Sequence, residues 1–369
     1  MQAYLFPGQG SQRVGMGDGL FEAFPELTEA ADAVLGYSIA ELCLRDPERR
    51  LTRTQFTQPA LYVVNALSHR RRLQETGAQP DFVAGHSLGE YNALECAGAV
   101  GFEDGLKLVR QRGELMAAAP KGTMAAVVGL PAGRIAEILA ENGLEALDVA
   151  NFNAPAQTIL SGLEPDIRAA QDCFERNGAT YIPLNVGGAF HSRYMRPAGE
   201  AFAAFLAEFT FAEPQIPVVA NVDAQPYRSG ETARRLADQL TQPVRWLDSV
   251  RFLLSEGVTD FLELGPGDVL TKLVRGIRSD FEANPPAPAA SAPELEPEAR
   301  PDAQATVAAW NRRHPVGTRV TVAGYERALT TKTPAVVLFG HRAAVYLEGY
   351  NGYFALEEVA PAAPAEAGA

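Results

Sequence analysis

Cysteine is scarce in this chain of 369 residues: it has three, Cys43, Cys96 and Cys173, which lie far apart and form no CxxC pair. That number and spacing argue against a disulfide framework and against a zinc site. We expect Cys43 and Cys96 to be small apolar residues of a packed core. Histidine is scarce too, with five in the chain, so a general base has few candidates.

The chain also lacks an excess of basic charge and a long apolar run. Its formal net charge is −13, whereas proteins that bind nucleic acid or anionic membranes are usually basic. No apolar run approaches the roughly 20 residues that span a bilayer. The opening residues, MQAYLFPGQG, lack the basic and apolar regions of a signal peptide. We therefore predict a cytoplasmic, monomeric protein that binds neither nucleic acid nor membrane.

What the chain does have is a composition that can build a core, with 47% hydrophobic and 21% charged residues. A short strand is predicted at residues 3–8, followed by a helix-rich region to about residue 78. Basic residues often end helices, so Arg70–Arg72 are predicted to end the last of these helices. The sequence DFVAGHS then predicts a buried strand and a sharp turn. These features favour the α/β class.

Residues 124–189 follow a different pattern, with segments in the order βαββαβ. This order is typical of a ferredoxin-like subdomain. Because no long linker interrupts the pattern, we predict that the subdomain is inserted into a larger α/β domain made of residues 1–123 and 190–281.

Beyond this core, residues 282–304 are rich in Pro, Ala and Glu, which predicts a linker. Apolar segments separated by Gly-containing turns return in residues 305–360 and predict a small β domain. We predict that its larger aromatic residues belong to its core; the alternative is that they contact a docked partner protein. These residues are Trp310, Tyr325, Tyr346, Tyr350 and Tyr353.

A candidate nucleophile lies in Gly85-His86-Ser87-Leu88-Gly89, a GxSxG motif between a predicted strand and a predicted helix. A serine on such a tight turn is held with its hydroxyl exposed, and the glycines keep the turn free of clashes. The following helix directs free N–H groups at the site, and the Leu88 N–H is the natural oxyanion donor. A Gly-rich turn with a buried serine is the alternative.

A serine hydroxyl needs a base. His86 adjoins Ser87, and its side chain diverges from that of the serine. His69 lies at the Arg-rich helix end, where we expect a solvated surface residue. His314 and His341 belong to the C-terminal domain. This leaves His191, which follows a predicted strand and a glycine pair, as the best candidate.

Several motifs in order resemble the malonyl-CoA:acyl-carrier-protein transacylase family of fatty acid and polyketide synthesis. They are FPGQGSQ (6–12), GHSLGE (85–90), RQRGELM (110–116), NFNAPAQTILSG (151–162), GAFHSRYM (188–195) and ELGPGDVLTKLV (263–274). The resemblance covers about residues 1–281. It implies an α/β-hydrolase-like core with an inserted ferredoxin-like subdomain.

By position, the resemblance implies a role for each matching residue. Ser87 would be the nucleophile and His191 the general base and acid. Gln9 would supply a second oxyanion N–H beside Leu88, and the carbonyl of Gln239 would orient the histidine. The substrate-binding residues would be Arg112, for the malonyl carboxylate, with Phe190, His86 and Met116.

The implied reaction moves a malonyl group from malonyl-CoA to the phosphopantetheine thiol of an acyl carrier protein or a polyketide synthase carrier domain, through a malonyl-serine. It needs no metal and no other cofactor. Arginine's planar fork suits a carboxylate, and the Phe190 ring would crowd an α-methyl group. The acidic carrier would need a local basic patch, for which Arg70–Arg72, Arg193 and Arg196 are candidates.

Two other functions compete with transfer. A proofreading acyl hydrolase on the same fold would use Ser87 and His191 but would not be expected to keep Arg112. A non-enzymatic docking role for carrier proteins is an alternative for the C-terminal domain alone. Because the linker and this domain depart from plain fatty-acid transacylases, we favour a discrete, trans-acting polyketide acyltransferase.

Overall fold

The computed structural model describes residues 1–284, 303–322, 328–338, 342–348, 353–356 and 359–362. The chain divides into two compact units, Met1–Pro285 and Pro286–Ala369, and each is considered by itself. Within the described ranges, no helix has the length and apolar character needed to cross a bilayer.

The centre of the first unit is a four-stranded parallel sheet. Its strands, in spatial order, are β7 (Val218–Val219), β2 (Phe82–Gly85), β1 (Gln2–Phe6) and β8 (Asp260–Glu263). The predicted first strand ends two residues early, at Phe6, because Pro7 has no N–H to continue the ladder. All four strands run in one direction, so their carboxyl ends meet at one edge of the sheet.

Helices cover both faces of this sheet, and alternate residues of β1 divide between the two cores. Tyr4 and Phe6 pack with α4 (Thr54–Thr76), α5 (Gly89–Cys96), α6 (Phe102–Ala118) and α9 (Arg196–Leu206). Ala3 and Leu5 pack with α11 (Trp246–Ser255) and α12 (Val269–Ala283). The remaining helices of this region are α1 (Leu20–Ala23), α2 (Pro25–Leu35), α3 (Ile39–Leu44), the 3-10 helix η1 (Arg193–Met195) and α10 (Thr232–Asp238). The result is the α/β class that the sequence predicted.

Two predictions about α4 are wrong. The helix does not end at Arg70–Arg72; it runs to Thr76, and Gly77 ends it with a left-handed φ of 64°. His69 is not on the surface, since only 7% of it is exposed. Its Nε2 lies 3.3 Å from Cys96 Sγ. Burial and the charge of Arg70 lower the pKa of His69 to about 4, so the imidazole is neutral at pH 7.

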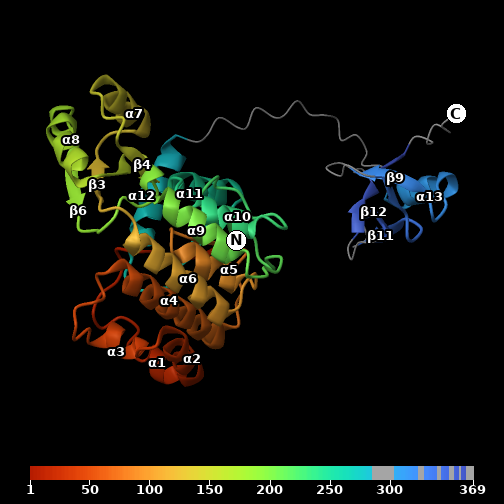
Figure 1. Cartoon of the computed structure of the whole chain (residues 1–369), viewed down its shortest axis with the longest axis horizontal. Helices are drawn as coiled ribbons and strands as arrows, with labels where there is room; N and C mark the ends of the chain where they lie inside the picture. The colour runs from red at the N-terminus through yellow and green to blue at the C-terminus, as the bar shows by residue number, and fades with distance from the viewer. Residues whose placement is uncertain (285–302, 323–327, 339–341, 349–352, 357–358, 363–369) are drawn as a thin grey trace. The chain divides into compact units, whose positions relative to one another are not determined.

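A second sheet follows α6 and is antiparallel throughout. Its strands are β4 (Asp148–Ala154), β5 (Gln157–Gly162), β3 (Thr123–Val128) and β6 (Thr180–Leu184), in that spatial order. The helices α7 (Ala132–Glu141) and α8 (Glu164–Arg176) pack on it around their own core, which includes Ile135, Leu160 and Phe174. These elements form a lobe at one end of the first unit, at the upper left of Figure 1.

Backbone hydrogen bonds join this lobe to the parallel-sheet region. The N–H of Phe152 donates to the carbonyl of Val244 at 2.9 Å, and the N–H of Val244 donates to that of Ala150 at 2.8 Å. Strand β4 is thereby held beside the segment that leads into α11, so the faces of the second sheet have a fixed position next to the first.

The second unit contains a helix that the sequence analysis did not predict, α13 (Ala303–Arg313). The described strands form two antiparallel sheets, β10 (Leu329–Thr330) with β9 (Arg319–Val322) and β14 (Val359–Pro361), and β11 (Val336–Leu338) with β12 (Arg342–Tyr346) and β13 (Tyr353–Ala355). Trp310 of α13 packs against their shared core. Tyr346 is half-buried, and Tyr325 and Tyr350 lie outside the described residues. His341 does so as well.

Candidate functional site

The turn between β2 and α5 carries Ser87 in a strained backbone. Ser87 has a φ of 51°, which costs a residue other than glycine about 1–2 kcal/mol. The flanking glycines are sterically required: a Cβ at Gly85 would lie 1.9 Å from the Gly89 carbonyl carbon, and one at Gly89 would lie 1.9 Å from the Phe6 oxygen. The strand, the turn and the helix are therefore packed too closely for any larger residue at these two positions.

Asn221 stabilises this turn from a different strand. It follows β7 and is 1% exposed. Its Oδ1 accepts a hydrogen bond from the Ser87 N–H at 2.7 Å, and its Nδ2 donates to the Gly85 carbonyl at 2.7 Å. The sequence analysis did not identify Asn221. The one available signal was a lone polar residue directly after the apolar run VVA.

His191 lies beside the serine and is also strained, with a φ of 55°. Its Nε2 is 2.7 Å from Ser87 Oγ, and its Nδ1 is 2.7 Å from the main-chain oxygen of Gln239. A carbonyl can only accept, so the proton belongs on Nδ1 and Nε2 is left free to accept from the serine. Burial and the charge of Arg112 lower the pKa of His191 to about 3, so the ring is neutral at pH 7.

Arg112, on α6, is a buried cation that touches the same serine. It is 1% exposed. Its Nη2 donates to Ser87 Oγ at 3.0 Å and to Gln239 Oε1 at 2.9 Å, and its Nη1 donates to Gln58 Oε1 at 2.6 Å. Burial lowers the pKa of this guanidinium. Its bonded partners in the described chain are hydroxyl and amide oxygens, so its full charge has no directly bonded carboxylate and suits an anionic ligand.

A chain of side chains leads from Arg112 to the loop after β1. Gln58 donates to Thr54 Oγ1 at 2.9 Å and approaches Met116 Sδ at 3.3 Å, and Thr54 donates to Gln9 Oε1 at 2.9 Å. Thr54 and Gln58, both on α4, were missed from the sequence. Both lie in the polar stretch TQFTQ at the start of the helix, which does not distinguish them from their neighbours.

The loop that carries Gln9 lies directly against the Ser87 turn. A Cβ at Gly8 would lie 2.3 Å from the His86 oxygen and 3.6 Å from the Leu88 nitrogen. In the described chain, the backbone N–H groups of Gln9 and Leu88 have no hydrogen-bond partner. Two unpaired donors beside a serine hydroxyl match the requirement of an oxyanion hole.

These residues surround a cavity of about 150 Å³. Phe190, which is 5% exposed, lies in its wall, and His86 is hydrogen-bonded through Nε2 to Asn153 Oδ1 at 2.8 Å. Burial lowers the pKa of His86. The lining residues are Gln9, Gln58, His86, Ser87, Leu88, Arg112, Met116, Met124, Asn151, Asn153, Ile159, Leu184, Val186, Phe190 and His191. All the site residues predicted from the sequence line this cavity except Gln239, which lies behind Arg112 and His191.

The basic residues that the sequence analysis proposed for binding an acidic carrier protein lie in two separate regions. Arg193 is paired with Asp148, and together with Arg196 it lines a hollow of about 390 Å³ that also reaches His191. By contrast, Arg70 lies twelve residues beyond Gln58 along α4, or about 18 Å at 1.5 Å per residue. It is half-buried and ion-paired with Glu95 at 2.5 Å. The Arg70–Arg72 cluster is therefore remote from the cavity.

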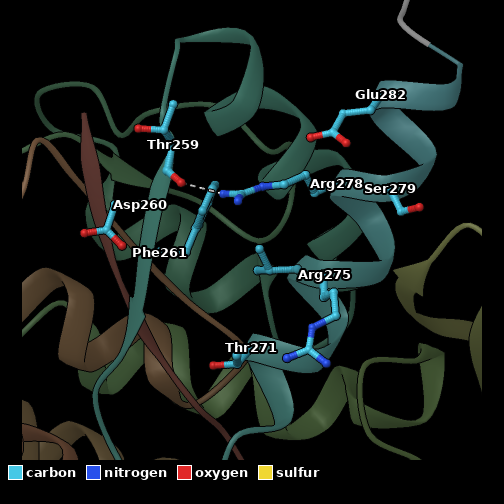
Figure 2. Close-up of a pocket in the computed structure, with 9 residues that line it drawn as sticks. Thr259, Asp260, Phe261, Thr271, Arg275, Arg278, Ser279 and Glu282 are labelled. Carbon is cyan, nitrogen blue, oxygen red and sulfur yellow. Dashed lines mark hydrogen bonds between the residues drawn. The ribbon is translucent and has the colours of Figure 1, made fainter.

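Another hollow, of about 400 Å³, lies between β8 and α12. Figure 2 shows Arg275 and Arg278 projecting into it from α12. Arg278 donates to the Thr259 carbonyl at 2.7 Å and stacks over the Phe261 ring. No histidine or cysteine lines this hollow. Within the described ranges, no group of three or more His, Cys, Asp or Glu side chains is placed to hold a metal ion.

Comparisons with known proteins agree with this geometry. Residues 3–320 match the family model described as acyl transferase domain. The polyketide biosynthesis malonyl CoA-acyl carrier protein transacylase BaeC of Bacillus velezensis is 52% identical over 287 residues, which cover 77% of this chain and 99% of BaeC. The polyketide biosynthesis protein ThaF of Burkholderia thailandensis is 51% identical over 312 residues, which cover 83% of this chain. That match spans only 27% of ThaF.

Among solved structures, a malonyl CoA-acyl carrier protein transacylase from Burkholderia pseudomallei matches with a TM-score of 0.75 and 51% sequence identity. The match covers 78% of this chain and 99% of that one.

Proposed function

Because this chain belongs to the acyl transferase domain family, we propose that it transfers a malonyl group from malonyl-CoA to the phosphopantetheine thiol of an acyl carrier protein. The observation that carries the proposal is the buried guanidinium of Arg112, 3.0 Å from Ser87 Oγ. A generic serine hydrolase has no need of a buried cation at this point, whereas a carboxylated acyl group does. BaeC, by its name, acts on the same donor and the same kind of acceptor.

In the first half of the reaction, Ser87 Oγ attacks the thioester carbonyl carbon while its proton passes to His191 Nε2, 2.7 Å away. The negative charge that develops on the carbonyl oxygen is stabilised by the N–H groups of Gln9 and Leu88. The C–S bond then breaks, and CoA takes the proton from His191 and leaves as the thiol. A malonyl ester of Ser87 remains.

In the second half, the carrier's thiol gives its proton to His191 and attacks the ester carbonyl. The Ser87 oxygen leaves and recovers the proton, so the enzyme returns to its starting state. Throughout, the carbonyl of Gln239 holds the His191 Nδ1–H at 2.7 Å and stabilises the imidazolium. The proposed cycle uses side-chain and main-chain groups of this chain and calls on no metal or redox group.

Arg112 links substrate choice to the strength of the base. In the free site, burial and, second to it, the charge of Arg112 lower the pKa of His191. When a malonyl carboxylate pairs with Arg112, the contribution of that charge is largely lost and the pKa of His191 rises, while the effect of burial remains. A malonyl group therefore improves the base that its own transfer requires, whereas an acetyl group does not. Phe190, in the cavity wall, would further crowd an α-methyl group.

For the architecture, we propose an α/β-hydrolase-like core with an inserted ferredoxin-like subdomain. The β-α-β-β-α-β order and the antiparallel arrangement β4-β5-β3-β6 support the second part. The division into residues 1–123 with 190–281, 124–189, 282–304 and 305–360 is part of the same proposal, as are a monomeric state and a cytoplasmic location.

The pathway we propose is polyketide synthesis, with the protein acting in trans on carrier domains. Both BaeC and ThaF carry polyketide biosynthesis in their names. The hollow beside His191, which Arg193 and Arg196 help to line, is the more suitable basic site for an acidic carrier because Arg70–Arg72 lie too far from the cavity.

The test is to incubate the protein with radiolabelled malonyl-CoA, first alone and then with a holo carrier protein. We expect labelled enzyme in the first case and labelled carrier in the second, with no label on the Ser87→Ala variant. Rapid release of free malonate without a labelled carrier would instead identify a hydrolase.

A further inference from the structure

One buried carboxylate at the site has no part in the reaction described above. Glu90, in the first turn of α5, is 1% exposed. Its Oε1 accepts hydrogen bonds from the Tyr227 hydroxyl at 2.5 Å and from the Asn221 N–H at 3.2 Å, and its Oε2 accepts one from Gln239 Nε2. A buried charge is costly unless it is neutralised nearby. Arg112 is the cation that interacts with it, and Gln239 is hydrogen-bonded to both residues.

Gln239 is hydrogen-bonded to Glu90, Ser87, Arg112 and His191. Its Nε2 donates to Glu90 and to the Ser87 carbonyl at 2.9 Å, and its Oε1 accepts from Arg112 Nη2 at 2.9 Å. Its main-chain oxygen accepts from His191. An amide has one donor end and one acceptor end, so the two ends cannot be exchanged without placing NH₂ against a guanidinium.

From this arrangement we infer that Glu90 is a positioning residue: its carboxylate fixes the orientation of the Gln239 amide and so places Arg112 to receive the acyl carboxylate. An ionised carboxylate can only accept, so it requires the NH₂ end of the amide. The oxygen end must then face Arg112. This inference rests on the proposed malonyl transfer.

Protonation of Glu90 would remove its part of this requirement, because a carboxylic acid can donate as well as accept, and the NH₂ end would then be held by the Ser87 carbonyl alone. Burial raises the pKa of Glu90 to about 7, against the opposing effects of its hydrogen bonds from Tyr227, Gln239 and Asn221 and of the charge of Arg112. The other titratable groups facing it, Tyr91 and Tyr227, have their pKa values raised by burial. His191, with a pKa of about 3, does not titrate near neutrality. Malonyl transfer should therefore decline as pH falls through about 7.

The direct test is Glu90→Gln, which keeps the size of the side chain but presents a second NH₂ group. We expect kcat/KM for malonyl-CoA to fall about 10–100-fold and kcat/KM for acetyl-CoA to fall far less, with the decline near pH 7 lost. Glu90→Asp, which keeps the charge, should retain most of the preference for malonyl. Equal losses for both substrates, with the wild-type pH profile intact, would overturn the inference.

Glu95→Gln is the matched control, since Glu95 is a buried carboxylate on the same helix that pairs with Arg70. It should leave the malonyl-to-acetyl ratio unchanged. If Glu90→Gln does not fold, Tyr227→Phe provides the second test: it removes a hydrogen bond that lowers the pKa of Glu90, so the decline should move to higher pH. An unmoved profile would contradict the inference. Malonyl transfer by the wild-type protein tests the proposed function separately.

Discussion

The two sheets of the first unit contribute to the site in different ways. The parallel sheet contributes the ends of its strands: Gln9 follows β1, Ser87 follows β2 and Asn221 follows β7. The antiparallel sheet contributes strand residues to the cavity wall, namely Met124, Asn151, Asn153, Ile159 and Leu184. The difference shows that the nucleophile, an oxyanion donor and the residue that holds the nucleophile's turn come from strand ends, where free backbone groups and tight turns converge. The shape of the acyl pocket comes from strand faces.

Arg112→Ala should have the largest effect on malonyl transfer, because it removes the cation that pairs with the substrate and leaves Gln58 and Gln239 without a donor. We expect kcat/KM for malonyl-CoA to fall about 10²–10³-fold and that for acetyl-CoA to fall much less. The measurement is steady-state transfer to a holo carrier with each donor. An equal fall for both donors would refute the carboxylate role.

Asn221→Ala tests the strand-end side of the comparison. It leaves the Ser87 N–H and the Gly85 carbonyl unpaired and frees the strained turn. We expect a loss of about 1–3 kcal/mol in the free energy of unfolding and a fall of about 10–100-fold in kcat with both donors. Chemical denaturation and single-turnover labelling of Ser87 measure the two effects. An unchanged labelling rate would show that the turn holds its shape without Asn221.

Phe190→Ser tests the wall, since Phe190 lies in the segment that leads from β6 back to the first sheet. Removing the ring should raise the methylmalonyl-to-malonyl ratio of kcat/KM by about 10–100-fold, because a pocket discriminates by about this factor between substrates that differ in one methyl group. Malonyl transfer itself should change little. Competition between the two CoA esters gives the ratio directly, and a ratio that stays constant would assign Phe190 to packing alone. Ile159→Ala, another substitution in the lining of the cavity, should change the ratio less.

His69→Leu should have the smallest effect, and on stability alone, because His69 lies outside the site. A neutral buried histidine has a folded pKa of about 4, below its unfolded value. The unfolded state therefore binds more protons between pH 6.5 and 4, and stability is lost as pH falls through that window. Wild-type protein should lose about 1–2 kcal/mol more than the variant between pH 7 and 5 in denaturation experiments. Identical pH dependences would exclude a buried, neutral His69.

The sequence predicted those parts of the site that lie in contiguous motifs. Ser87 is flanked by glycines that sterics require, and Arg112 and His191 lie in segments with a recognisable order. Gln58 and Asn221 could not be predicted, because each acquires its partners only when distant segments pack. Gln58 is one of several polar residues in TQFTQ, and Asn221 is a lone polar residue after VVA. His69 was misplaced because its neighbours are arginines; on a helix, adjacent residues point in different directions.

The α/β class and the order of elements in residues 124–189 followed from periodicity, which is a local property. The spatial order β7-β2-β1-β8 did not, since it depends on tertiary contacts between strands. Helix α13 was missed because its alanine-rich sequence adjoins the Pro- and Ala-rich segment and shares much of its composition.

The position of Asn221 has a consequence for how the protein loses activity. Strand β7, just before it, is only two residues long and lies at the edge of the parallel sheet. Edge elements with few hydrogen bonds open locally at a lower free-energy cost than the core strands. When β7 separates, the Ser87 turn loses both of its hydrogen bonds to Asn221 while β1 and β2 remain paired. Inactivation on warming should therefore begin as a local, reversible opening of one edge strand, at temperatures where the rest of the fold is still intact.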